Sequence, residues 1–196
     1  MPDCPSFDAW SLLFLVAAVQ GLFIALVLFR LRRGYRQANR LLAGVLLLFS
    51  LTMGEYVLFW THCLYRFPHV AEASAQFPFL YGPLLWLYFR QVYSGREVTR
   101  ADWWHFLPFL ASAALMVPWY WLDTSAKQAI VSGQGRFPVR QEIVEATIVA
   151  RMLHMLAYAA WNAVYIYRQP RVGATTRWAA WLNWFYTGFV LAYASY

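Results

Sequence analysis

The chain has 196 residues, of which 61% are apolar, 20% aromatic and only 13% charged, and its formal net charge is +7. Its charged fraction is well below the roughly 25% of globular domains, which excludes an ordinary soluble domain, and its high hydrophobicity excludes a disordered chain. The basic residues occur in short stretches between apolar runs, a distribution typical of membrane topology. We therefore expect an all-α protein, a polytopic transmembrane helical bundle in which residues 1–196 form a single membrane domain.

Six apolar runs have about the 18 residues needed to cross a hydrocarbon core about 30 Å thick. In chain order, their approximate bounds are 11–29, 41–60, 73–89, 103–122, 143–167 and 178–196. The third run carries Pro78 and Pro83, so we expect a broken or kinked helix there. Aromatic residues cluster near the ends of the runs, as the interfacial belts of membrane proteins require.

The distribution of arginine and lysine predicts the orientation of the bundle. Eleven of the 16 Lys and Arg residues follow the first, third and fifth runs, and only four lie in the connections at the other end. The positive-inside rule then places the amino terminus of this multi-pass protein outside. Because six spans would also leave residue 196 outside, we expect a seventh helix and a cytoplasmic output domain to follow.

Several segments carry a resemblance to a known family. They are RLRRGYRQANRLLAGVLLLFSL at 30–51, LYRFPHV at 64–70, FPFLYGPLLWLYFRQVYSG at 77–95 and DWWHFLPFL at 102–110. These segments resemble the seven-helix membrane region that precedes AraC-type helix-turn-helix domains in bacterial transcriptional regulators. The resemblance implies a sensory region that detects a small ligand or envelope component and passes the signal to a cytoplasmic DNA-binding domain. The resemblance also implies a location in the bacterial inner membrane. The sequence shows no recognition helix, so DNA would be a partner only through a C-terminal domain outside it.

Other functions stay open at this point. Residues 1–196 show no G-x-S-x-G elbow, no H-E-x-x-H motif and no phosphate-binding glycine loop, so we predict neither an enzyme nor a cofactor site. Ionisable residues inside the runs would also suit a small membrane transporter or an intramembrane enzyme. Since related membrane regions precede histidine kinases too, the sensory region of a kinase is a further alternative.

The candidate ligand-binding residues are Glu55, Arg151 and His154, which lie inside apolar runs. An isolated charge at mid-membrane costs at least about 2.5–3.5 kcal/mol, so such residues mark functional sites or buried pairs. Opposite helix directions bring Glu55 and Arg151 to similar depth in the outer half, and Arg151 and His154 share a helix face. The cluster predicts either a site for an anionic or polar ligand or an ion pair that only fixes helix packing.

Residues of the outer connections suggest weaker sites. His62, Cys63, His69 and Glu72 are residue types that bind metals, but their spacing matches no known site, so no metal site is predicted. Cys4 and Cys63 would both lie outside, where a disulfide can form.

Small and amide side chains suit contacts between helices. Ala17, Gly21 and Ala25 form a small-residue stripe on the first run, which fits packing inside one bundle or in a homodimer. For Asn162 and Asn183 we expect hydrogen bonds between helices.

Overall fold

The computed structural model describes residues 7–32, 35–169 and 173–195, the side chains of 173–176 and 195 excepted. Every regular element in these ranges is a helix, so the all-α prediction is confirmed. The long helices are α1 Ala9–Arg30, α2 Arg36–Trp60, α3 Pro78–Ser94, α7 Gln141–Arg168 and α8 Gly173–Ser195. The shorter elements are η1 Cys63–Tyr65, η2 Arg100–Phe106, α4 Leu107–Leu115, α5 Val117–Tyr120 and α6 Thr124–Val131.

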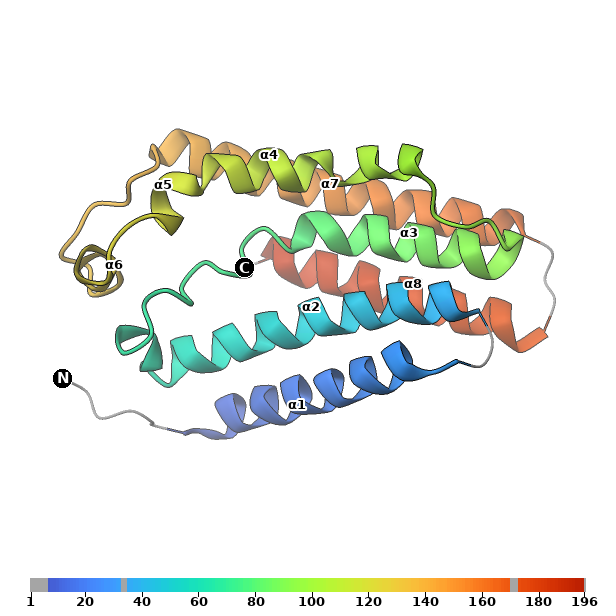
Figure 1. The fold of residues 1–196 in the computed structure, drawn as a ribbon, viewed down its shortest axis with the longest axis horizontal. Coiled ribbons are helices and arrows are strands. Elements are labelled where there is room, and N and C mark those ends of the chain that lie inside the picture. The colour runs from blue at the N-terminus through green and yellow to red at the C-terminus, as the bar shows by residue number, and fades with distance from the viewer. Residues whose placement is uncertain (1–6, 33–34, 170–172, 196) are drawn as a thin grey trace.

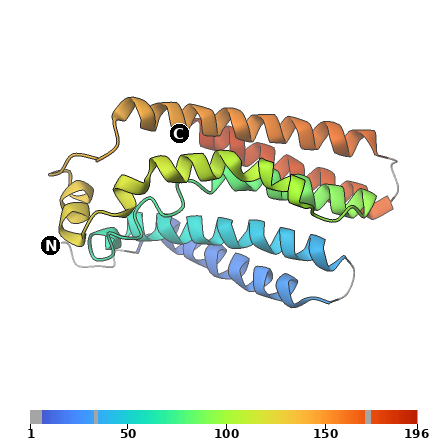
Figure 2. The ribbon, with the colours of Figure 1, turned by 45° about the horizontal axis from the view of Figure 1, so that its top comes forward.

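The long helices run side by side along the longest axis of the molecule (Figure 1). α1, α3 and α7 run in one direction, and α2 and α8 run in the opposite direction (Figure 1). α1 packs on α2, α2 on α3, α3 on α7 and α7 on α8, so α3 and α7 are in contact although four shorter elements separate them in sequence. Seen from a second direction, α6 lies across one end of the bundle (Figure 2). We call η1, α5 and α6 the cap, and the end of the bundle that they occupy the cap end.

Three helices, α1, α2 and α7, are both long enough and apolar enough to cross a membrane. The surface of α1 also suits lipid better than water, because large apolar side chains cover it. Trp10 and Phe23, for example, are 67% and 66% exposed. Three of the six predicted runs are thus matched by helices of spanning length and composition. α3 and α4 are shorter, with 17 and 9 residues.

α1 packs on α2 through small residues, as predicted. One residue of the predicted stripe, Ala17, does not belong to the contact. Ala18 and Ala25 are buried, and a Cβ added to Gly21 would lie 2.4 Å from Ser50 Oγ of α2. Ala17 is exposed instead. The buried alanines are seven positions apart, about two turns, and so lie on one face that packs inside this bundle.

The third predicted run begins its helix five residues late, at Pro78, and the helix α3 is not broken at Pro83, whereas the alternative of a kink stays a prediction. α3 begins with Pro78 at its first turn, where a missing N–H leaves no intrahelical bond unmade. The helix continues through Pro83, which removes a single bond near its start. It ends at Gly95, whose φ of 63° suits glycine and whose N–H donates to the Gln91 carbonyl at 3.0 Å.

The fourth predicted run, residues 103–122, is not a single helix. The structure divides it among the 3-10 helix η2, then α4 and α5. Pro118 explains the second division, because its ring cannot fit against the carbonyl four residues earlier in a continuous helix. Met116, between α4 and α5, accordingly leaves helical geometry with φ −90° and ψ 0°.

The bundle interior is built around α3. Tyr81, Leu85 and Phe89 of this helix are at most 1% exposed. Phe49 of α2 stacks on Tyr81 with 4.1 Å between ring centroids, and Phe189 of α8 meets Phe49 edge-on at 4.8 Å. Aromatic pairs of this geometry add to the stabilisation from burial. α2, α3 and α8 therefore share one aromatic contact.

The cap has a small core of its own. Trp119 is 1% exposed and packs with Leu64 and Ala71, while its indole N–H donates to the Ala71 carbonyl at 3.0 Å. Lys127 of α6 is 2% exposed, and its Nζ lies 5.4 Å from the centre of the Trp119 ring. These contacts fix the α2–α3 connection against α5 and α6.

Candidate functional site

A cavity of about 190 Å³ lies near the cap end, between α2, the start of α3, α7 and α8. Its polar and charged lining comes from three helices and from the α2–α3 connection: Thr52, Glu55, Glu72, Ser74, Arg151 and Tyr193. Tyr81 and Phe189 add aromatic surface. The structure therefore brings Glu55 and Arg151, two of the three residues selected from the sequence, to one cavity.

Glu55 is half-buried on α2, little more than one turn before that helix ends. Its Oε2 accepts a hydrogen bond from the backbone N–H of Ser74 at 2.8 Å. This bond holds the α2–α3 connection against α2 at the edge of the cavity. A carboxylate accepts up to about four hydrogen bonds, so Glu55 keeps capacity for a further donor.

Arg151 is the buried cation of the cavity. It is only 7% exposed, and its Nη1 donates to Tyr193 Oη at 2.6 Å. Its Nε is buried without a hydrogen-bond partner among the residues that the structure describes. A buried guanidinium without a carboxylate partner is costly, because neither water nor an opposite charge compensates it.

The direct ion pair between Glu55 and Arg151 is not formed. Over the described ranges, salt bridges join Arg90 to Asp102 and Arg140 to Glu142. Both Glu55 and Arg151 instead reach the cavity with other partners, one a backbone amide and the other a phenol. The cavity between them is therefore lined by two opposite charges that are not in direct contact.

Glu72 brings a second carboxylate to the cavity from the α2–α3 connection. Its backbone has a φ of 62°, a left-handed conformation that few residues other than glycine adopt. Although solvent reaches part of the residue, protein surrounds much of it, and this burial raises the pKa of its carboxyl. The nearby Glu55 raises this pKa further, and Arg151 partly opposes the change.

His154 lies away from the cavity, in contrast to its predicted place in the cluster. Its ring packs edge-on against Phe79 with 5.2 Å between centroids and lies 4.8 Å from the Tyr158 ring. Neither ring nitrogen of His154 has a hydrogen-bond partner in the described part of the chain. Three positions along α7 amount to about 4.5 Å of rise, which places His154 deeper in the bundle than Arg151.

The residues considered for metal binding have other contacts. His69 Nε2 lies 2.9 Å from Thr124 Oγ1, and Lys127 Nζ lies 3.1 Å from His69 Nδ1. Among the described residues, no three His, Cys, Asp or Glu side chains lie close enough together to hold a metal ion. Cys63 is disulfide-bonded, while Cys4 lies outside the described residues, so the pairing of Cys4 with Cys63 stays a prediction.

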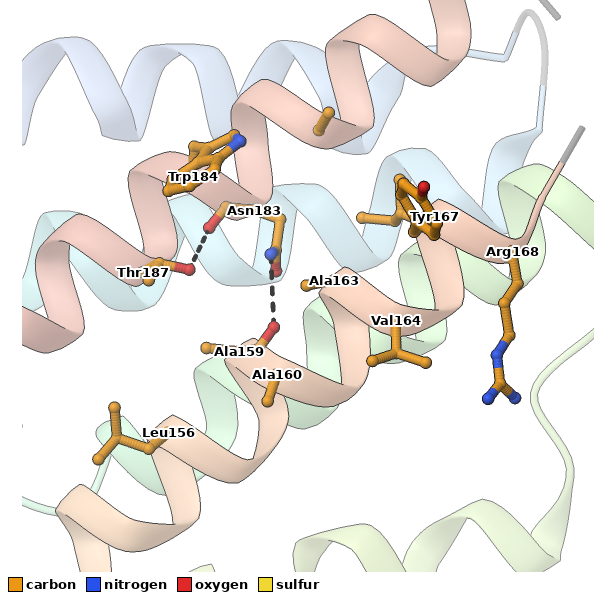
Figure 3. Close-up of a pocket in the computed structure, with 12 residues that line it drawn as sticks. Leu156, Ala159, Ala160, Ala163, Val164, Tyr167, Arg168, Asn183, Trp184 and Thr187 are labelled. Carbon is orange, nitrogen blue, oxygen red and sulfur yellow. Dashed lines mark hydrogen bonds between the residues drawn. The ribbon is translucent and has the colours of Figure 1, made fainter. Parts of the chain in front are cut away.

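A larger groove of about 730 Å³ runs between α7 and α8 (Figure 3). Small side chains of α7 line it, including Ala159, Ala160 and Ala163, together with Trp184 of α8. Asn183 bridges the two helices, since its Nδ2 donates to the Ala159 carbonyl at 3.4 Å (Figure 3). The groove carries little charge and does not include the residues of the polar cavity.

Asn162 was expected to form a hydrogen bond between helices as Asn183 does. It is fully buried on α7, yet neither polar atom of its amide has a partner among the side chains and backbone that the structure describes. Only one of the two predicted asparagine contacts is therefore present.

Sequence reasoning did not assign four polar residues to the cavity: Thr52, Glu72, Ser74 and Tyr193. The sequence offers a weak indication for Glu72, because it is an acidic residue beside an apolar run. It offers no indication for Tyr193, which is one of 13 tyrosines.

No protein-family model, no curated protein and no solved structure matches this chain.

Proposed function

We propose that this chain is the membrane-embedded sensory region of a bacterial AraC-type transcriptional regulator. It crosses the inner membrane six times with the amino terminus outside, and it passes a signal to a cytoplasmic DNA-binding domain that lies outside this sequence. The signal is a ligand or envelope component that reaches the bundle from its cap end.

The polar cavity is the observation that carries this proposal. A partly open cavity of about 190 Å³ joins a buried, incompletely bonded Arg151 to Glu55 and Glu72. Charges inside a membrane domain are expensive and mark sites of function more often than sites of packing. An ion pair that served only packing would have its two charges in contact, which is not the case for Glu55 and Arg151.

The arrangement of the helices supports six spans. α3 and α8 lie parallel to α1, α2 and α7 within one bundle (Figure 1), so a bilayer that surrounds the latter also surrounds the former. At 1.5 Å per residue, the 17 residues of α3 extend about 26 Å, close to the thickness of a hydrocarbon core. The interrupted helices η2, α4 and α5 follow the same direction on one side of the bundle (Figure 2).

The cap end is the outer end in this proposal. Cys63, at the start of η1, is disulfide-bonded, and disulfides persist in oxidising compartments such as the periplasm. The opposite end carries most of the arginines, for example Arg36, Arg96 and Arg168 at helix ends. Both observations support the proposal that the cavity lies in the outer half of the membrane.

The hydrogen bond from Arg151 to Tyr193 links the cavity to α8. A ligand that binds the guanidinium competes with the tyrosine for it and so changes how α7 holds α8. Such a change in the contact between two helices is an established type of signal transmission.

The first test is the reading frame that follows codon 196. A helix-turn-helix domain there supports the regulator, a kinase domain would assign the sensory region to a histidine kinase, and a stop codon would overturn the proposal.

The second test uses the full-length protein. Arg151→Gln should abolish the change in the transcript profile that the intact regulator produces, with unchanged amounts of protein in the membrane. Arg140→Gln is the matched control, because Arg140 lies directly before α7 with its side chain 76% exposed. Equal transcript profiles for the Arg151→Gln variant and the unaltered protein would contradict a sensing role for the cavity.

A small membrane transporter is the second candidate, and one observation favours it. Buried polar atoms of His154 and Asn162 without partners in the described ranges continue inward along α7 from the cavity. Intramembrane polar residues in such a row are typical of ion and proton paths. Uptake of a radiolabelled solute into proteoliposomes containing this chain alone would favour transport over sensing.

A further inference from the structure

We infer that the polar cavity binds a small zwitterion, a molecule with one ammonium and one carboxylate group such as a free amino acid. The inference rests on the proposed function in that it treats the cavity as the sensing site, and it adds the chemical class of the ligand.

The size of the cavity limits the ligand. A volume of about 190 Å³ is smaller than the 300–1,000 Å³ of pockets that hold drug-sized molecules. Larger envelope components such as whole lipids or peptidoglycan fragments do not fit inside it. The occupant is a metabolite of the size of an amino acid.

Arg151 and Tyr193 form the anionic subsite. The guanidinium is buried, uses Nη1 for Tyr193 Oη, and has an Nε without a partner among the described groups. A guanidinium presents its donors in a planar fork that matches the two oxygens of a carboxylate. A ligand carboxylate at this position supplies the charge that no residue in the described ranges provides within 4.0 Å.

Glu55 and Glu72 form the cationic subsite. Both carboxylates line the cavity, and the hydrogen bond from the Ser74 N–H that fixes Glu55 occupies only Oε2. Tyr56 and Tyr81 also line this space, although Phe49 stacks on one face of the Tyr81 ring. An ammonium group donates three hydrogen bonds, which suits two carboxylates at one side of a small cavity.

The combination of charges excludes ligands with a single charge. A simple anion that meets Arg151 is repelled by Glu55 and Glu72, and a simple cation that meets these carboxylates is repelled by Arg151. A zwitterion presents its carboxylate to Arg151 and its ammonium group to Glu55 and Glu72, so each subsite meets a group of opposite charge. Site geometry thus favours separated opposite charges within one small molecule.

The test measures binding to the purified chain in detergent by thermal unfolding, followed through its 11 tryptophans. The probes are the common L-amino acids tested singly, with propionate and ethylamine as the matched anion and cation of alanine. We expect at least one amino acid to raise the unfolding temperature in a saturable way, and neither single-charge probe to do so at equal concentration. A rise with propionate or ethylamine alone, or no rise with any probe, would overturn the inference.

Two substitutions assign the subsites. Arg151→Gln and Glu55→Gln should each weaken binding of that amino acid at least tenfold, whereas Arg140→Gln and Glu142→Gln, an exposed pair, should leave it unchanged. If either cavity variant fails to fold, the probe selectivity of the unaltered protein still decides the question. Unchanged affinity in both cavity variants would show that the amino acid binds elsewhere.

The outcomes separate this inference from the proposed function. An amino acid that binds the cavity but does not alter the transcript profile of the full-length protein would refute sensing and keep the ligand class. A profile that depends on Arg151 in a chain that binds no amino acid would refute the ligand class and keep sensing.

Discussion

Arg90 and Asp102 form a buried, doubly hydrogen-bonded ion pair at the end of the bundle opposite the cap. Nη1 and Nη2 of Arg90 each lie 2.6 Å from one carboxylate oxygen, and the Thr99 N–H donates to Oδ2 at 2.6 Å. Both side chains are at most 10% exposed. Asp102 therefore holds the connection between α3 and η2 to the bundle.

We predict that Asp102→Asn lowers the free energy of unfolding by about 3–5 kcal/mol, because it leaves the Arg90 charge buried and unpaired. The measurement is the unfolding temperature in detergent. Glu142→Gln is the control, since the exposed Arg140–Glu142 pair should contribute almost nothing. Equal unfolding temperatures for both variants would show that the buried pair does not stabilise the fold.

The same pair should make the stability of the fold depend on pH. Hydrogen bonds from Arg90 hold the pKa of Asp102 well below its ordinary value of 3.8, and the Thr99 amide adds to this effect. A carboxyl whose pKa is lowered by folding stabilises the protein above its ordinary pKa, and this contribution is lost as the pH falls. The stability difference between the unaltered protein and Asp102→Asn should therefore be constant above about pH 5 and shrink below about pH 4.

Gly82 marks the closest approach of α3 to α7. A Cβ added at this position would lie 2.4 Å from Cβ of Tyr158, a distance that backbone movement alone can relieve. Gly54 on α2 offers a matched comparison, because an added Cβ there meets nothing within 4 Å. We predict that Gly82→Ala lowers the unfolding temperature and that Gly54→Ala raises it slightly through helix propensity. Similar shifts for both variants would contradict the close packing of α3 on α7.

At the scale of elements, α7 and α8 are joined at the cavity by the bond from Arg151 to Tyr193. A double-mutant cycle of Arg151→Gln with Tyr193→Phe should give a coupling of about 1–3 kcal/mol in the free energy of unfolding. The cycle of Arg151→Gln with Glu55→Gln should give a smaller coupling, because these two side chains make no direct contact. The reverse order of couplings would indicate that the ion pair, and not the bond to Tyr193, ties the helices together.

The long apolar helices were predictable within a few residues because length and composition alone define them. Residues 11–29, 41–60 and 143–167 became α1, α2 and α7, each slightly longer than its apolar run. The division of residues 103–122 was not predicted, although Pro108 and Pro118 were visible in the sequence. Proline inside an apolar run begins a helix when it lies in the first turn and divides one when it lies later, and the apolar pattern does not distinguish these cases.

The site was predictable in part for a related reason. Depth along a helix follows from residue counting, so Glu55 and Arg151 were placed together correctly at the level of one cavity. The direction in which a side chain points, and the partner it meets, depend on helix rotation and packing, which a single sequence does not contain. His154 was misplaced for this reason, and the bond between Arg151 and Tyr193 could not be predicted.

At the scale of the whole molecule, the orientation of the bundle is testable by labelling. In a background with Cys4→Ser and Cys63→Ser, a cysteine at Gln134 should react with a membrane-impermeant maleimide in intact cells, and one at Arg96 should be protected. Both positions are exposed in the structure and lie at opposite ends of the bundle, so access differs only through the membrane. Protection at Gln134 with reaction at Arg96 would invert the topology and move the cavity to the cytoplasmic half.

The amides of Asn162 on α7 and Asn183 on α8 have a consequence for how this bundle moves. Asn162 keeps both polar atoms without a partner among the described residues, and the bond from Asn183 to Ala159 is long at 3.4 Å. An interface of this kind gains hydrogen bonds when its helices rotate or slide, so its observed packing competes with others of similar free energy. About 1.4 kcal/mol changes such a balance tenfold, less than one good charged hydrogen bond at Arg151 supplies. If the cavity has the proposed sensing role, a ligand that competes for Arg151 supplies enough free energy to change how α7 packs against α8.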